Sequence, residues 1–257
     1  MPVHTSEAVI LRTWPVHEAD LVVSFYTRDF GRLKGIAKSA LKSRKRFGGA
    51  LEPMTMVRAY FADRPRQELV RLDQLEVVRS PLAGRVDSPR LAALSFYAEL
   101  LDEALPEHDP QDTVFRLLVS VLEHTTAVGA GGSETASSGP WMALTYFSLW
   151  MVRLMGLMPD LGRCSVCAEA LQAGELWFSP FSDGVYCELH RPGSASALSA
   201  DSWQVAQRML REPVAAFAEE PWARKRGQDL RRFAVGTLER HLERRLKSAE
   251  ALGRLGG

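Results

Sequence analysis

The sequence predicts a mixed, multi-domain protein in which an N-terminal all-β barrel is followed by an α-helical domain that carries a small cysteine-rich module. Three observations support this fold class. The first part of the chain holds short runs rich in β-branched and aromatic residues, the later part repeats apolar residues at helical spacing, and all three cysteines lie in one short region. A chain of 257 residues that is 46% hydrophobic can fill the cores of more than one domain.

The β prediction covers residues 1–82. Turn chemistry at Asp29-Phe30-Gly31 separates two of the runs, as expected between short strands. Five short strands in this length favour a small closed barrel, for which an OB-fold is one common solution and an SH3-like barrel is another. The predicted strands are Ala8–Leu11, Leu21–Tyr26, Leu33–Ala37, Met54–Phe61 and Glu68–Val78.

The helical prediction covers residues 83–159 and 195–257, which we expect to form one domain around the cysteine-rich module. Apolar residues recur there at spacings of three and four, which is typical of amphipathic helices. Pro140 is well placed to begin one of them, because proline is favoured at the first helical position. The expected helices span residues 91–105, 114–121, 140–158, 202–210 and 229–246.

Three cysteines and a histidine form two closely spaced pairs within residues 160–194. The pairs are Cys164-x2-Cys167 and Cys187-x2-His190, with a short loop between them. This is the spacing of a tetrahedral zinc site, because each two-residue turn lets both side chains reach one ion. Four protein ligands leave no position for water, so we expect a structural zinc ion. The alternative is three buried cysteines and an unrelated histidine.

Positive charge is concentrated between residues 32 and 46, although the net charge of the chain is only +1. This segment has no acidic residue, and its basic residues are Arg32, Lys34, Lys38, Lys42, Arg44, Lys45 and Arg46. Because phosphates bind such unopposed cations, we predict a DNA contact here. Aromatic rings could also stack on the bases of a single strand. The candidate rings are Phe25, Tyr26, Phe30, Phe47, Tyr60 and Phe61, and several of them must instead fill the barrel core. A solvated face without a partner is the alternative.

A second basic group lies near the C-terminus. Arg224, Lys225, Arg231 and Arg232 are further candidates for contact with DNA. Acidic residues such as Asp229 are interleaved with the cations of this region, so pairing of charges on a helix surface is an equally good explanation.

The sequence lacks the motifs of several common enzyme classes, so we expect a non-catalytic protein. It has no G-x-x-x-x-G-K-[ST] loop, no G-x-S-x-G elbow and no H-E-x-x-H pair. The alternatives are a zinc-dependent nuclease or hydrolase and a zinc-containing DNA-binding transcription regulator. We expect a cytoplasmic protein, because the N-terminus does not resemble a signal peptide and polar residues interrupt the most apolar stretch, 141–158.

A set of short motifs is distributed over the chain: AVILRT (8–13), HEADLV (17–22), YTRDFG (26–31), AKSA (37–40), KSR (42–44), LEP (51–53) and LMPDL (157–161). In this order they closely resemble the RecO family of bacterial recombination mediators. The resemblance implies an N-terminal OB-fold and a helical domain that contains a zinc module. Lys38, Lys42 and Arg44 fall in the family's basic motif. Ala168 and His190 stand where the family commonly has glycine and cysteine.

The resemblance also implies an activity and partners. RecO proteins bind single- and double-stranded DNA and anneal complementary strands without turnover chemistry. With RecR they help to load RecA onto strands covered by single-stranded-DNA-binding protein (SSB), whose acidic tail has an apolar terminus. We therefore expect DNA, RecR and SSB as partners, RecA as an indirect one, no membrane, and association with the nucleoid. The SSB tail would suit a groove with a basic rim on the helical domain.

Overall fold

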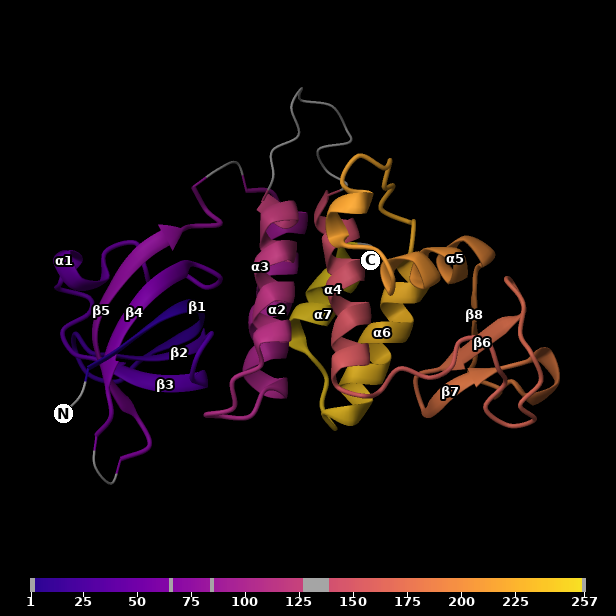
Figure 1. Cartoon of the computed structure of the whole chain (residues 1–257), viewed down its shortest axis with the longest axis horizontal. Coiled ribbons are helices and arrows are strands. Elements are labelled where there is room, and N and C mark those ends of the chain that lie inside the picture. Colours follow the sequence, from indigo (N-terminus) through magenta and orange to yellow (C-terminus); the bar gives the residue numbers. More distant parts are fainter. Residues whose placement is uncertain (1–2, 65–66, 84–85, 127–138, 256–257) are drawn as a thin grey trace. The chain divides into compact units, whose positions relative to one another are not determined.

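The residues described by the computed structural model are 3–64, 67–83, 86–126 and 139–255 (Figure 1). The chain divides into two compact units. The first contains Met1–Asp87 and Leu94–Leu122, and the second contains Ser88–Ala93 and Glu123–Gly257. The first unit therefore includes helical residues in addition to the strands predicted for residues 1–82. The division into domains at 82, 159 and 195 stays a prediction.

Five strands of the first unit form a closed barrel (Figure 1). They are β1 (Val3–Pro15), β2 (Leu21–Thr27), β3 (Gly31–Ala37), β4 (Met56–Ala62) and β5 (Val70–Arg79). Their order around the barrel is β1-β2-β3-β5-β4, and β1 closes it by pairing with both β2 and β4. The pairs are antiparallel except for β3 with β5. Each strand predicted from the sequence overlaps one of these five.

Alternation along the strands builds the barrel core. Val23, Phe25 and Leu33 turn inward and are almost completely buried, as the two-residue period of a strand requires. A β-bulge interrupts β1 between Ile10 and Arg12 and changes which side chains face inward beyond it.

Three of the six aromatic rings suggested for base stacking fill this interior. Phe25, Phe47 and Phe61 are each at most 1% exposed and are the candidates that form the core, as expected for several of the six. Tyr26 is buried on the outer side of β2, where its hydroxyl reaches Gln111. A ring that is fully enclosed contributes apolar burial and cannot reach a nucleic acid. Phe30 and Tyr60 are half-buried.

Two helices, α2 (Ser88–Ala104) and α3 (Asp112–Thr126), follow the barrel in the chain. Within the first unit, hydrogen bonds join this helical region to the outer side of β2. The hydroxyl of Ser24 donates to the carboxylate of Asp102 at 2.6 Å, and the hydroxyl of Tyr26 donates to the carbonyl of Gln111 at 2.9 Å. The polar side chains on that side of β2 are thereby buried with their hydrogen bonds satisfied.

Gly31 marks the closest approach between the barrel and the connection from α2 to α3. Its φ is +71°, in the left-handed region, and a Cβ atom there would lie 2.5 Å from the backbone of Asp109. Only glycine meets both conditions. The packing of this connection against β3 therefore depends on the absence of a side chain at residue 31.

The second unit is mainly helical. Its helices are α4 (Gly139–Leu154), α5 (Ala200–Met209), α6 (Gln228–His241) and α7 (Lys247–Arg254), with the short 3-10 helix η3 (Val214–Phe217). Helix α4 is buried along most of its length and packs against α5 and α6. In the described part of the chain, no helix is both long enough and apolar enough to cross a membrane.

The single helix predicted over residues 229–246 is wrong. Helix α6 ends at His241, and α7 begins only at Lys247. Between them, Glu243 adopts a φ of 52°, which breaks the right-handed helical path. The side chain of Glu239 accepts a hydrogen bond from the backbone N–H of Leu246 at 2.8 Å and stabilises this break.

The cysteine-rich module contains a small antiparallel sheet. Its elements are β6 (Leu176–Ser179), β7 (Ser182–Tyr186), the 3-10 helix η2 (Glu188–His190) and β8 (Ser196–Leu198), and β6 pairs with both other strands. Arg240 of α6 attaches the hairpin to the helices. Its guanidinium donates to the carboxylate of Asp183 at 3.0 Å and to the carbonyl of Pro180 at 3.2 Å.

Candidate nucleic-acid interface and metal centre

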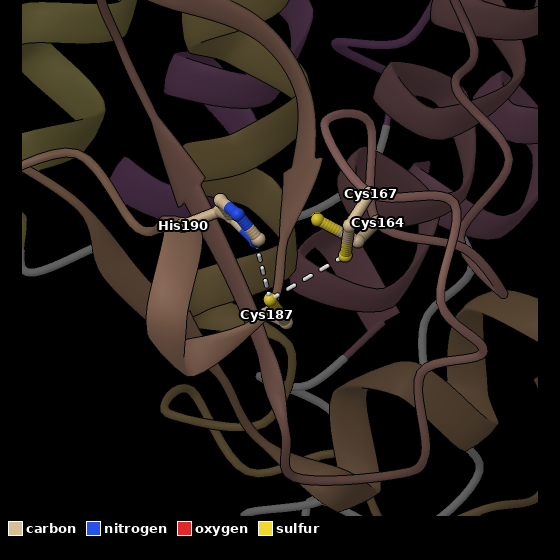
Figure 2. Close-up of side chains that lie close together, drawn as sticks. All are labelled: Cys164, Cys167, Cys187 and His190. Atoms are coloured by element: carbon tan, nitrogen blue, oxygen red, sulfur yellow. Dashed lines mark hydrogen bonds between the residues drawn. The ribbon is translucent and has the colours of Figure 1, made fainter.

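The four side chains predicted to bind a metal converge at one point (Figure 2). Cys164 and Cys167 precede β6, Cys187 follows β7, and His190 ends η2. Their possible ligand atoms all lie within 4.8 Å of one another. The Sγ atoms of Cys167 and Cys187 are 4.0 Å apart, and Sγ of Cys187 is 3.1 Å from Nδ1 of His190. The cluster could hold a metal ion.

The geometry fits a thiolate metal site, and so does the lowered pKa of Cys164. Zinc–sulfur bonds of about 2.3 Å in a tetrahedron place two sulfur atoms about 3.8 Å apart, and the Cys167–Cys187 distance is 4.0 Å. Burial raises the pKa of Cys164, but backbone hydrogen bonds from Cys167, Cys187 and Val166 outweigh it and lower that pKa to about 6. Thiolate is the form that binds metal.

Ala168 completes the turn that carries the first cysteine pair. Its backbone N–H donates to the carbonyl of Cys164 at 2.9 Å, and its φ is 59°. Glycine adopts this left-handed conformation without strain, whereas alanine does not. This conformation gives a physical reason for the glycine that the family resemblance leads us to expect at this position.

Arg32 and Lys34 of the basic segment are engaged with the helical region of the first unit. Nε of Arg32 donates to the carbonyl of Leu105 at 2.8 Å, and Nη1 lies 3.6 Å from Asp102 and 3.3 Å from Glu107. Lys34 lies 2.8 Å from Glu107, and this hydrogen bond lowers the pKa of the Glu107 carboxyl group below its ordinary value. The Arg32 side chain is only 12% exposed. Its charge therefore holds the helical region against β3.

The other cations of the basic segment lie in the loop after β3 and in the short helix α1 (Arg44–Phe47). Lys38, Lys42, Arg44 and Lys45 are exposed, and the described residues place no carboxylate within ion-pair distance of any of them. Arg46 differs, because its guanidinium donates to the carbonyl of Lys38 at 2.7 Å. We call Lys38, Lys42, Arg44 and Lys45 the loop cations. They present unneutralised charge to solvent, and Arg46 stabilises the loop.

The C-terminal basic group divides in the same way. Arg231 is 5% exposed, donates to the carbonyl of Arg224 at 2.7 Å, and lies 5.1 Å from the ring centroid of Trp141. Burial lowers the pKa of Arg231 to about 10. Arg224, Lys225 and Arg232 are exposed. Of the four C-terminal residues predicted to contact DNA, only Arg231 is thus buried in the interior of the second unit.

Arg231 also lines a pocket of about 140 Å³ in the second unit. Trp141 and Leu144 of α4 and Leu252 of α7 give it apolar walls, and Arg232 lies at the same pocket. In the described part of the chain, Nε of Arg231 has no hydrogen-bond partner. An apolar pocket that contains a buried guanidinium suits an apolar group with a negative charge. The sequence did not predict this pocket, because α7 was not predicted as a separate helix.

Comparison with known proteins relates almost the whole length of the chain to a single protein family. Residues 1–81 match the family model described as recombination protein O N terminal, and residues 85–250 match the model described as recombination protein O C terminal. The chain is 48% identical to the DNA repair protein RecO of Koribacter versatilis, over 97% of this chain and 98% of that protein. It is 31% identical to the DNA repair protein RecO of Pelotomaculum thermopropionicum, over 100% and 96% of the two chains.

Proposed function

The chain belongs to the RecO family of DNA repair proteins, and we propose that it acts in repair as a non-catalytic recombination mediator. In this role it binds single- and double-stranded DNA and anneals complementary strands. With RecR it promotes loading of RecA onto single strands coated with SSB, in the cytoplasm at the nucleoid. The observation that carries the proposal is the group of four exposed loop cations, with which no carboxylate of the described residues forms an ion pair.

The N-terminal barrel is, in this proposal, an OB-fold that supplies the main DNA contact. The support is its five-stranded closed order, β1-β2-β3-β5-β4, with one parallel pair. Loops of an OB barrel are a usual place for binding of single strands. The DNA site consists of Lys38, Lys42, Arg44 and Lys45, and it excludes Arg32, whose guanidinium is occupied within the first unit.

The metal in this proposal is zinc, and its role is structural. Cys164, Cys167, Cys187 and His190 would hold it, and four protein ligands would exclude water from the ion. Zinc bound there would crosslink the two ends of the module and would hold no reactive water. This argues against the alternative of a zinc-dependent hydrolase, which needs an open coordination position.

The pocket beside Arg231 is the proposed docking site for the acidic tail of SSB. Its apolar walls would take the apolar terminus of the tail, and the exposed guanidinium group of Arg232 would pair with a carboxylate. The positive charge of Arg231 in the wall of this pocket supports this assignment.

The proposal is tested by annealing two complementary fluorescent oligonucleotides without any nucleotide cofactor. If the protein is a recombination mediator, it should accelerate annealing for several unrelated sequences, and both strands should remain intact on a denaturing gel. Cleaved strands would favour the nuclease alternative. Strong binding to only one sequence among many would favour a transcription regulator, because regulators read base edges.

A further inference from the structure

Trp14 lies on the outer face of the barrel. It pairs with Val22 on β2, and Val22 pairs with Ile36 on β3. Directly paired residues share one face of a sheet. Their chain neighbours Val23 and Ala37 belong to the buried core, so this row faces outward. All three residues of the row are half-buried, and the row therefore forms a small apolar surface.

Arg12 accompanies the ring on the same face. Its guanidinium carbon lies 5.0 Å from the centroid of the Trp14 ring. Arg12 is exposed, and within the described part of the chain it forms no ion pair. The guanidinium therefore covers a face of the ring through a weak cation–π contact, with no carboxylate to hold it there.

The apolar row is adjacent to the loop cations. Lys38 directly follows β3, two residues after Ile36. The loop is fixed beside the turn from β1 to β2, because the N–H of Leu41 donates to the carbonyl of Ala19 at 3.2 Å. Two apolar side chains of these segments are also unusually exposed, Val16 at 46% and Leu41 at 61%. An aromatic and aliphatic surface thus lies next to exposed positive charge.

We propose that Trp14 is a base-stacking residue for single-stranded DNA. The loop cations bind the phosphate backbone, a base stacks on the Trp14 ring, and Arg12 moves from the ring to a phosphate. A duplex keeps its bases stacked on one another, so Trp14 contributes to binding of single strands only. The surrounding cations favour a polyanion over a protein surface as the occupant. This inference rests on the proposed DNA-binding function.

Three variants and three labelled DNAs test the inference by fluorescence anisotropy over a range of salt concentrations. Trp14→Leu keeps apolar volume but removes the ring, Trp14→Phe keeps a ring, and Phe181→Ala removes a ring of the second unit that is 77% exposed. The DNAs are oligo-dT, an abasic strand of the same length and a duplex. We expect Trp14→Leu to weaken oligo-dT binding about tenfold. Its salt slope and its binding to the other two DNAs should not change.

The controls separate stacking from charge. Trp14→Phe should recover most of the affinity for oligo-dT, and Phe181→Ala should bind like the wild type. Arg12→Ala leaves the ring in place and should lower the salt slope on oligo-dT by about 0.7, the value for one phosphate contact on a single strand. This variant tests the site even if Trp14→Leu fails to fold, as a melting curve would reveal.

The outcomes distinguish the inference from the function on which it rests. Unchanged binding of oligo-dT by folded Trp14→Leu, or an equal loss on the abasic strand, would overturn the stacking role. An unchanged salt slope in Arg12→Ala would overturn the assignment of Arg12 to a phosphate. If the wild type bound none of the three DNAs, the proposed DNA-binding function itself would fail.

Discussion

Arg32 is the residue for which the structure and the charge pattern make opposite predictions. The charge pattern places it among seven DNA-contacting cations, whereas the structure places its guanidinium against Leu105, Asp102 and Glu107. Arg32→Ala removes a charged hydrogen bond, which contributes about 1.5–3 kcal/mol. It also leaves Asp102, whose side chain is 9% exposed, without its cation. Breaking a buried pair in this way costs about 3–5 kcal/mol. Because these costs overlap and water reaches part of the site, we expect a loss of about 3 kcal/mol.

Urea unfolding followed by circular dichroism measures this loss. Lys38→Ala is the matched control, since it removes an exposed cation of the same segment and should change stability by no more than about 0.5 kcal/mol. Arg32→Met combined with Asp102→Asn removes both charges, keeps an acceptor for Ser24, and should recover much of the loss. If Arg32→Ala were as stable as Lys38→Ala but lost more DNA affinity, the structural role of Arg32 would be refuted.

Four further predictions follow from individual contacts. Gly31→Ala should destabilise the protein by about 3 kcal/mol or more, and Gly49→Ala by about 1 kcal/mol. Both glycines have a φ of +71°, but only a Cβ atom at residue 31 would meet backbone atoms, at 2.5 Å. Equal shifts in melting temperature for the two variants would contradict this. The hydrogen bond with Lys34 is the main cause of the lowered pKa of Glu107 in the folded protein. The stabilisation from ionised Glu107 is therefore fully present above the ordinary pKa of about 4.3, and it is lost as the pH falls through the folded pKa. Glu107→Gln removes this stabilisation. Urea midpoints at pH 7 and pH 3 check this, and an equal difference at both would count against it. Ala168→Gly should raise the melting temperature of the metal-loaded protein, by relief of about 1 kcal/mol of left-handed strain, and a lower value would contradict the assigned conformation. A zinc chelator should speed alkylation of the three cysteines and leave DNA binding by the barrel unchanged; a parallel loss of binding would show that the module contributes to the DNA site.

The strands were predictable from the sequence because they are short runs rich in β-branched and aromatic residues. Runs such as Leu21–Tyr26 alternate between the core and the outer side, and both sides are apolar enough to be recognised. The end of α6 was not predictable, because apolar spacing continues through Leu242 and Leu246. Only the conformation of Glu243 reveals that the helix stops. The convergence of Cys164, Cys167, Cys187 and His190 was predictable, because their spacing alone expresses the geometry that one ion would impose.

The nucleic-acid surface could be predicted only in part, because charge counts do not contain tertiary partners. Arg32 and Lys38 look alike in sequence, and the groups that bind Arg32 are contributed by α2 and the residues after it, far along the chain. Trp14 was missed for another reason. Simple alternation from Ile10 would turn Trp14 into the core, but the bulge between Ile10 and Arg12 reverses the faces beyond it.

The central claim is that the loop cations form the DNA site. The most direct test is the salt dependence of single-stranded DNA binding by the triple variant Lys38→Ala, Lys42→Ala, Arg44→Ala, compared with the matched triple variant Arg224→Ala, Lys225→Ala, Arg232→Ala. With melting temperatures unchanged, our account predicts that the first variant binds weakly and that its salt slope falls by about 2, as expected for three lost phosphate contacts. It predicts that the second variant keeps the wild-type slope. Unchanged binding by the first variant and a reduced slope in the second would contradict the claim and move the DNA site to the C-terminal cations.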